Sequence, residues 1–402
     1  MPLGWIDFSK SERSKILSIL DALSEDATLD ELGIAPIRDG FANLFFPGTS
    51  TIQTRAKYFF IVPYAMRDLE CSNELQPGRM LKTLTEIEKQ CALRLLDKNE
   101  NEEGVIGKRS LPDRWVKRAP SDIYWAGLRR YNIFLGGSMS LSEYIRSMCI
   151  QKAQKQELTN LGNRNDNSED DEKDDVQAGD VRGFRFWNMP LYNRTWSETL
   201  DMNLTSDEKD FLKKQILLTC PDSMLGCILK NDMQEVLELN DFKDLQDIIR
   251  LFPDRIQEDY DLALRFSGFV YALRVIYNIL ISDGESQHAN AELVRLLPDL
   301  PGIAGIDMDR IFVRLGVHNP KLHRFLDEAR KQMISQDTDK LKELIRNREK
   351  DLKGQARAKT CHPGQYENRW YGGEGLDYRF GNAMRILRDI FAKEVTDSAQ
   401  PE

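Results

Sequence analysis

The sequence lacks the short motifs that mark the common nucleotide-binding and hydrolytic sites. It contains no Gly-x-x-x-x-Gly-Lys-Ser/Thr run to hold phosphates and no dinucleotide-binding glycine pattern. Only four histidines occur, and none forms the His-x-x-x-His or His-Glu-x-x-His pair of a metal site. A Ser-His-Asp or Cys-His site built from distant residues stays open. From local motifs we therefore predict no catalytic residue, no metal ligand and no cofactor.

Paired cysteines and long apolar runs are also missing. The six cysteines stand far apart without a Cys-x-x-Cys pair, which is typical of reduced thiols in a cytosolic protein. The start of the chain has neither the basic nor the apolar region of a secretory signal. The most apolar segment, 266–281, is too short to cross a bilayer and contains Arg274. We therefore expect a cytoplasmic protein without a membrane span.

The composition is that of a soluble globular protein with an uneven distribution of charge. Hydrophobic residues make up 41% and charged residues 30% of the 402 residues, enough for two or three domains with cores of their own. The net charge of −9 argues against a uniformly basic nucleic-acid-binding protein. Segment 163–180, NRNDNSEDDEKDDVQAGD, has almost no apolar side chain with which to offset the entropy of ordering. We predict an N-terminal helical domain at 1–162, an acidic flexible linker at 163–182 and a C-terminal helical domain at 183–402.

Helix signals dominate both predicted domains. Capping boxes, in which a hydroxyl and a carboxylate bind the free backbone N–H groups of a helix start, are predicted at Ser9–Glu12, Ser140–Glu143 and Thr205–Glu208. Apolar residues recur at helical spacing in 266–280, predicting a central core helix, and again after Asp377. Strand signals are sparse, with 51–54, 58–62 and 183–187 as candidates. The predicted fold is mostly α, a multi-helical two-domain protein in which a small β element or wing stays open.

Cations concentrate in segment 105–135, the most positive stretch of the N-terminal half. A basic loop followed by a short helix resembles the way helix-turn-helix modules place cations against phosphates. A solvated basic face is the alternative. The candidate nucleic-acid-binding residues of this segment are Lys108, Arg109, Arg114, Lys117, Arg118, Arg129 and Arg130.

Two further segments combine cations with features that suit phosphates or bases. Segment 45–60 has a Pro-Gly turn and a hydroxyl cluster, with Arg55 and Lys57 close behind. Near the C-terminus, Arg357, Arg369 and Trp370 belong to a run of cations, aromatics and glycines of the kind that binds single strands by stacking. A capped helix and a packed loop would have the same patterns, so both alternatives stay open.

Four runs in the sequence resemble an uncharacterised prokaryotic family, a domain of unknown function, along essentially the whole chain. The runs are GWIDFS, LGIAPIRDGFANLFFPGTSTIQTRAKYFFIVPY, APSDIYWAGLRRYNIF and WYGGEGLDYRFGNAMRILRDIF. The resemblance implies a component of a bacterial anti-phage defence locus, encoded beside helicases and phospholipase-D-type nucleases. It supplies no catalytic residue.

We therefore predict a non-catalytic subunit of an anti-phage defence system that binds DNA or RNA, or bridges to a helicase or phospholipase-D-type nuclease. The acidic segment 163–180 would compete for the same cations. One alternative is a metal-dependent nuclease, because Asp39 followed by Gln53, Arg55 and Lys57 is a distorted version of a nuclease motif. The other is a pure protein-interaction scaffold.

Overall fold

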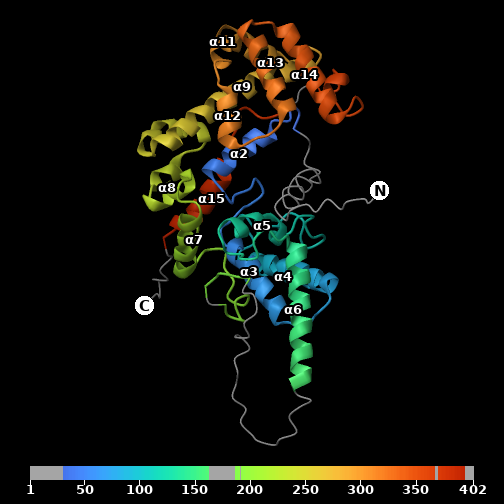
Figure 1. The fold of residues 1–402 in the computed structure, drawn as a ribbon, viewed down its shortest axis with the longest axis vertical. Coiled ribbons are helices and arrows are strands. Elements are labelled where there is room, and N and C mark those ends of the chain that lie inside the picture. The colour runs from blue at the N-terminus through green and yellow to red at the C-terminus, as the bar shows by residue number, and fades with distance from the viewer. Residues whose placement is uncertain (1–29, 163–185, 191, 367–369, 394–402) are drawn as a thin grey trace, which may run out of the picture. The chain divides into compact units, whose positions relative to one another are not determined.

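The computed structural model describes residues 30–162, 186–190, 192–366 and 370–393 (Figure 1). Within these residues the regular structure is helical, and the β structure is one isolated bridge between Phe134 and Trp187. The prediction of a mostly α, multi-helical fold is confirmed. Segment 58–62, a strand candidate, lies in helix α3, where ten of the 14 residues are buried. The sequence of a helix that is buried on nearly every side is a continuous apolar run. A buried strand has the same kind of run, so the sequence alone does not distinguish the two.

The described chain forms two compact units, each assembled from segments that lie far apart in the sequence. Unit 1 contains residues 30–45 and 241–378, and unit 2 contains the described parts of 46–240 together with 379–393. The predicted linker at 163–182 lies outside the described residues. Unit 2 nevertheless includes helices from both sides of that linker, so the units do not follow the division at 163–182.

Unit 2 is built around the buried helix α3, which packs against α4 and α5. The hydroxyls and carboxylates of Ser140–Glu143 and Thr205–Glu208 bind backbone N–H groups reciprocally, so these two capping boxes are confirmed; Ser9–Glu12 lies outside the described residues. Helix α15 confirms the helix predicted after Asp377. The helices of unit 2 are α3 (Tyr58–Cys71), α4 (Pro77–Lys98), α5 (Pro120–Arg130), α6 (Leu141–Gly162), α7 (Ser206–Thr219), α8 (Met224–Lys230), η1 (Gln234–Glu238) and α15 (Phe380–Phe391).

Unit 1 surrounds one long helix, α9, whose neighbours include α10 and α14. Seventeen of its 28 residues are buried, which confirms the predicted core helix. The helices of unit 1 are α2 (Ala35–Phe45), η2 (Phe242–Asp247), η3 (Ile249–Leu251), α9 (Asp254–Ile281), α10 (Gln287–Leu296), η4 (Leu297–Asp299), α11 (Leu300–Ile303), α12 (Met308–Leu315), α13 (Pro320–Ile334), α14 (Thr338–Lys353) and η5 (Lys359–Cys361).

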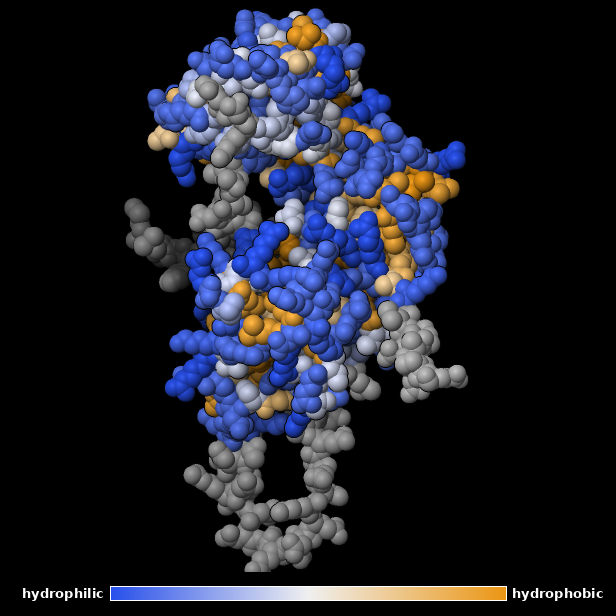
Figure 2. All heavy atoms as spheres, turned by 180° about the vertical axis from the view of Figure 1, so that it is seen from behind, coloured by the Kyte–Doolittle hydropathy of each residue, from blue (hydrophilic) through white to orange (hydrophobic). Residues whose placement is uncertain are grey.

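Helix α9 is longer than the apolar segment 266–281 suggested. Among the described helices it is the one long and apolar enough to cross a membrane, but 72% of its most apolar window is buried inside the protein. This burial is typical of a core helix. Figure 2 shows one face of the molecule, on which hydrophilic residues predominate and apolar residues gather in separate patches.

Candidate nucleic-acid interface

Residues 105–119, here called the basic loop, precede helix α5 in unit 2 and are anchored to the core of that unit. Val105 and Ile106 are buried, and the Ile106 N–H group donates to the Tyr58 hydroxyl over 2.8 Å. Gly107 has a φ of +94°, and a Cβ atom there would lie 2.7 Å from the Trp115 ring. The loop is therefore held in place by its apolar side chains, although it has no helix of its own.

Most cations of the basic loop lie at the surface. The side chains of Arg109, Arg114 and Lys117 are exposed, and no carboxylate of the described residues forms an ion pair with them. Arg118 is exposed as well, whereas Lys108 is half-buried and its Nζ donates to the Glu102 carbonyl over 3.0 Å. The loop therefore presents positive charge to solvent from a fixed backbone.

Helix α5 differs from the recognition helix of a helix-turn-helix module. Segments 99–119 and 131–140 separate it from its neighbours, whereas such modules use a turn of about three or four residues. Seven of its 11 residues are buried. At its end Arg130 is exposed, whereas Arg129 is half-buried and its Nη1 donates to the Ser138 carbonyl over 3.0 Å. The candidate surface is thus the basic loop with Arg130, and no helix is free to enter a groove here.

Arg55 is held inside unit 2 by two carboxylates. Its Nε lies 2.8 Å from Asp389 Oδ1, and its Nη1 lies 2.9 Å from Glu102 Oε1. The second Asp389 oxygen accepts the Ala56 N–H group over 2.6 Å. Burial raises the pKa of Asp389, and the Arg55 charge opposes that rise. The Arg55 guanidinium, whose side chain is 17% exposed, is thus engaged by the protein itself.

Lys57 is engaged in the same way. Its side chain is 8% exposed, and its Nζ lies 2.7 Å from Glu208 Oε2. The same oxygen accepts the Thr205 N–H group in the capping box of α7. We therefore leave Arg55 and Lys57 out of the surface proposed below.

Two hydroxyls near Arg55 are also bonded within the protein, whereas the buried Ser50 hydroxyl has no partner among the described residues. Thr49 Oγ1 donates to the Phe46 carbonyl and Thr54 Oγ1 to the Gly104 carbonyl, each over 2.6 Å. The Tyr124 hydroxyl accepts the N–H groups of Thr54 and Arg55. Segment 46–57 thus has the contacts of a structural element of unit 2.

Sequence reasoning missed the acids that complete this element. Asp389 follows the cations by more than 300 residues, and Glu208 was noted only as a helix cap. The one signal at Asp389 is an acid flanked by the apolar residues of α15.

The C-terminal candidates lie in unit 1. Arg357 is exposed, with its Nε donating to the Lys353 carbonyl over 3.1 Å. The half-buried Trp370 ring lies 4.9 Å from the His288 ring and 6.1 Å from the Tyr271 ring, between centroids. Arg369 lies outside the described residues. Because other rings already contact Trp370, less of its indole is free to stack on a base.

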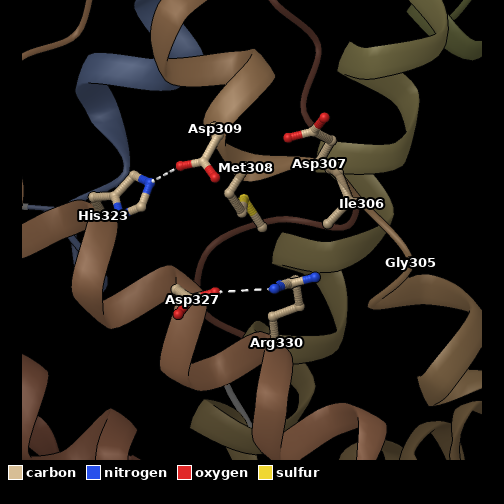
Figure 3. Close-up of a pocket in the computed structure, with 8 residues that line it drawn as sticks. All are labelled: Gly305, Ile306, Asp307, Met308, Asp309, His323, Asp327 and Arg330. Carbon is tan, nitrogen blue, oxygen red and sulfur yellow. Dashed lines mark hydrogen bonds and ion pairs between the residues drawn. The ribbon is translucent and has the colours of Figure 1, made fainter.

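A shallow pocket of about 370 Å³ in unit 1 gathers polar side chains from α12 and α13 (Figure 3). His323 Nε2 lies 2.7 Å from Asp309 Oδ1, and Arg330 Nη2 lies 3.1 Å from Asp327 Oδ1. Each of these groups points toward its partner, in a hydrogen bond between His323 and Asp309 and in an ion pair between Arg330 and Asp327. Among the described residues no group of three or more His, Cys, Asp or Glu side chains could hold a metal ion.

Asp39, the acid of the nuclease alternative, lies in unit 1 and pairs with Arg38 over 3.1 Å. Gln53 lies in unit 2, buried, with its Nε2 donating to the Gly48 carbonyl over 3.2 Å. Neither residue thus has a described neighbour that would complete a metal site.

Among the comparisons with known proteins, one match covers the N-terminal part of the chain. No curated protein and no solved structure matches. The matched region contains α2 to α5 and the basic loop but neither α7 nor α15, and it is shorter than the whole-chain resemblance expected from the sequence. Residues 1–154 match a family of unknown function, DUF6361.

Proposed function

We propose that the protein is a non-catalytic subunit that binds nucleic acid through the basic loop and Arg130 of unit 2. The observation that carries this proposal is that Arg109, Arg114 and Lys117 are exposed and form no ion pair with a described residue, in a chain with a net charge of −9. A cation that pairs with a phosphate releases the counterions condensed on the nucleic acid. A cation that is already paired with a carboxylate would gain less binding free energy from a phosphate, because it would first have to leave its partner.

The contacts of the loop favour recognition of the phosphate backbone. Trp115, the aromatic residue of the basic loop, lies against Gly107 and is half-buried. Phosphate contacts position a protein on nucleic acid but do not read its sequence. Because the loop backbone is anchored at Ile106, less conformational entropy is lost on binding. We therefore expect binding that depends strongly on salt and weakly on sequence.

In this proposal the protein acts in the bacterial cytoplasm, in an anti-phage defence complex with a helicase or a phospholipase-D-type nuclease. The support for this setting is the family resemblance of the sequence. All six cysteines are free, which suits a reducing compartment. The partner enzyme would supply the chemistry, and this chain would hold the nucleic acid.

The test is fluorescence anisotropy with a labelled 30-base-pair duplex over a series of salt concentrations. The variant Arg109→Ala/Arg114→Ala/Lys117→Ala is compared with Arg79→Ala/Lys82→Ala/Lys214→Ala, which removes three exposed cations of α4 and α7. We expect the loop variant to bind at least about tenfold more weakly than the wild type. The slope of log affinity against log salt concentration should become shallower by about 2–3, since each phosphate contact contributes about 0.9 to that slope. No binding at low salt, or equal losses in both variants, would overturn the proposal and favour an interaction scaffold.

A further inference from the structure

Segment 370–378 of unit 1, which contains the run WYGGEG, lies along helix α9. Tyr371 donates its N–H group to Asn278 Oδ1 over 2.9 Å and accepts Asn278 Nδ2 at its carbonyl over 3.0 Å. Further along, the Leu376 N–H group donates to Ser267 Oγ over 2.9 Å, and the Tyr378 hydroxyl donates to the Ala263 carbonyl. The segment thus runs antiparallel to α9 and is tied to it at both ends.

Between these ties, Gly372 passes directly over Arg274. A Cβ atom on Gly372 would lie 2.8 Å from Arg274 Nε, and the φ of Gly372 is +94°. Both the space and the backbone conformation therefore require glycine at this position. The close approach brings the main chain of the segment against the guanidinium.

The Arg274 guanidinium has no partner among the residues that the structure describes. Its side chain makes no hydrogen bond or ion pair with the described residues, and Nη1 is fully enclosed without an acceptor. Burial lowers the pKa of Arg274. An enclosed charge without a partner is unfavourable, because its lost hydration is not replaced.

The charged groups nearest to Arg274 are already engaged with other groups. The Asp30 carboxylate accepts the N–H groups of Leu32 and Ile34. Glu31 pairs with Lys353 and Lys359 in unit 1. The cation that faces Arg274, Arg38, pairs with Asp39. Of these charged residues, Arg274 is thus the one without a described counter-ion.

The neighbouring main chain adds hydrogen-bond donors. Gly372 and Gly373 are exposed, both have positive φ, and within the described residues their N–H groups make no hydrogen bond. Successive free N–H groups in such a turn form a concave anion site. Because Nη1 is enclosed, the groups of the guanidinium left for a ligand are Nε and Nη2, whose parallel N–H groups match two oxygens of a phosphate.

We propose that Arg274, together with the N–H groups of Gly372 and Gly373, binds the phosphate group of a small molecule. The bound oxyanion supplies the counter-ion that the described part of the chain does not provide at Arg274. The site belongs to α9 and unit 1 and uses no residue of the basic loop. Trp370, two residues before Gly372 and half-buried, provides an aromatic neighbour if the phosphate belongs to a nucleotide.

The test is thermal unfolding and calorimetric titration of the full chain with inorganic phosphate, ATP and adenosine, at constant ionic strength in chloride. Arg274→Met is compared with Arg265→Met, which removes an exposed arginine of the same helix that pairs with Asp261. We expect saturable stabilisation of the wild-type protein by phosphate or ATP but not by adenosine. Arg265→Met should respond in the same way, and Arg274→Met should respond at least tenfold more weakly.

The ligand-free Arg274→Met protein should melt at a higher temperature than the wild type, because the substitution removes an unpaired charge. Arg274→Lys, which keeps the charge but not the planar fork, should bind at least fivefold more weakly than wild type. ATP binding much tighter than phosphate identifies a nucleotide ligand, and equal affinities identify free phosphate. The loop variant Arg109→Ala/Arg114→Ala/Lys117→Ala should respond to phosphate as wild type does, so failure of either proposal leaves the other intact. No saturable response in the wild type, or a full response in Arg274→Met, would overturn the inference.

Discussion

Arg55 and Asp389 form an ion pair within unit 2 across 334 positions of sequence. Arg55 lies inside the region that matches the family, and Asp389 lies in α15, outside that region. The Lys57–Glu208 pair joins the matched region to α7 in the same way. The part of the matched region from residue 46 on therefore belongs to a larger folded unit, in which Arg55 and Lys57 pair with carboxylates from later parts of the chain.

Removal of the Asp389 carboxylate should destabilise the protein strongly. Asp389→Ala removes the acceptor of the Arg55 Nε and of the Ala56 N–H group in a largely buried site, and leaves Glu102 as the one carboxylate that pairs with Arg55. Breaking such a pair from one side costs about 3–5 kcal/mol. Asp261→Ala, which breaks the exposed pair with Arg265, should cost less than about 1 kcal/mol. Urea unfolding at pH 7 measures the free energy of unfolding of both variants. Equal decreases in the two variants would contradict a large contribution of the Arg55–Asp389 pair to stability.

Residues 1–154 made alone should not unfold cooperatively. In the full chain the Phe60 ring of α3 packs 6.0 Å from the Phe211 ring of α7, and Lys57 is buried against Glu208. Without residues beyond 154 this apolar surface is uncovered, Lys57 loses Glu208, and Arg55 keeps Glu102 but loses Asp389. Circular dichroism during heating measures the transition, with the full chain as control. A sharp melting transition of the fragment would show that it is complete by itself.

Glu88 should make stability fall as pH rises. Burial, as the largest cause, raises its pKa to about 8; Oε1 accepts the Ser121 N–H group over 2.6 Å, and Oε2 has no partner. Because the pKa in the folded state exceeds the ordinary 4.5, the folded state holds the proton more tightly. This stabilisation is complete below pH 4.5 and is lost between pH 4.5 and about 8.

Glu88→Gln should remove that loss while keeping an acceptor for Ser121. We expect the free energy of unfolding of the wild type to fall by a few kcal/mol more than that of Glu88→Gln between pH 5 and pH 8.5. Urea unfolding at the two pH values gives the difference. Parallel pH dependence in the two proteins would show that Glu88 ionises normally.

Gly107→Ala should weaken nucleic-acid binding without a change of charge. The added Cβ atom would lie 2.7 Å from the Trp115 ring, at a φ of +94°, and would detach the basic loop from its anchor. Gly137→Ala is the control, since its φ is +63° but nothing lies within 4 Å. Both variants should lose about 1 kcal/mol or more of stability from backbone strain. Only Gly107→Ala should bind the labelled duplex more weakly; equal affinities would mean that the anchor does not matter.

The helices could be predicted from the sequence where local signals suffice. The capping boxes at Ser140 and Thr205 and the apolar spacing along α9 depend on neighbours within a few residues. Segment 58–62 could not be assigned, because a helix buried on all sides loses its periodicity. The chain's division into two units could not be predicted either, since it depends on contacts between segments hundreds of residues apart.

The candidate site was predicted only in part for the same reason. Patterns of cations show where positive charge is, but not which cations are paired. Arg55 and Arg109 look alike in sequence, and only the fold shows that the first is paired with Asp389 while the second is exposed. Arg274 appeared in the sequence only as an interruption of an apolar segment. Its lack of a partner depends on how segment 370–378 lies over α9.

The order of segments in the two units has a consequence for synthesis on the ribosome. The chain starts unit 1, builds most of unit 2, returns to finish unit 1 and ends in unit 2. Arg55 and its first carboxylate, Glu102, therefore leave the ribosome long before its second, Asp389, has been translated. Until α15 emerges, Arg55 lacks one of its two carboxylates and the apolar surface that α15 covers stays exposed to solvent, and this interval is when chaperones would be needed most.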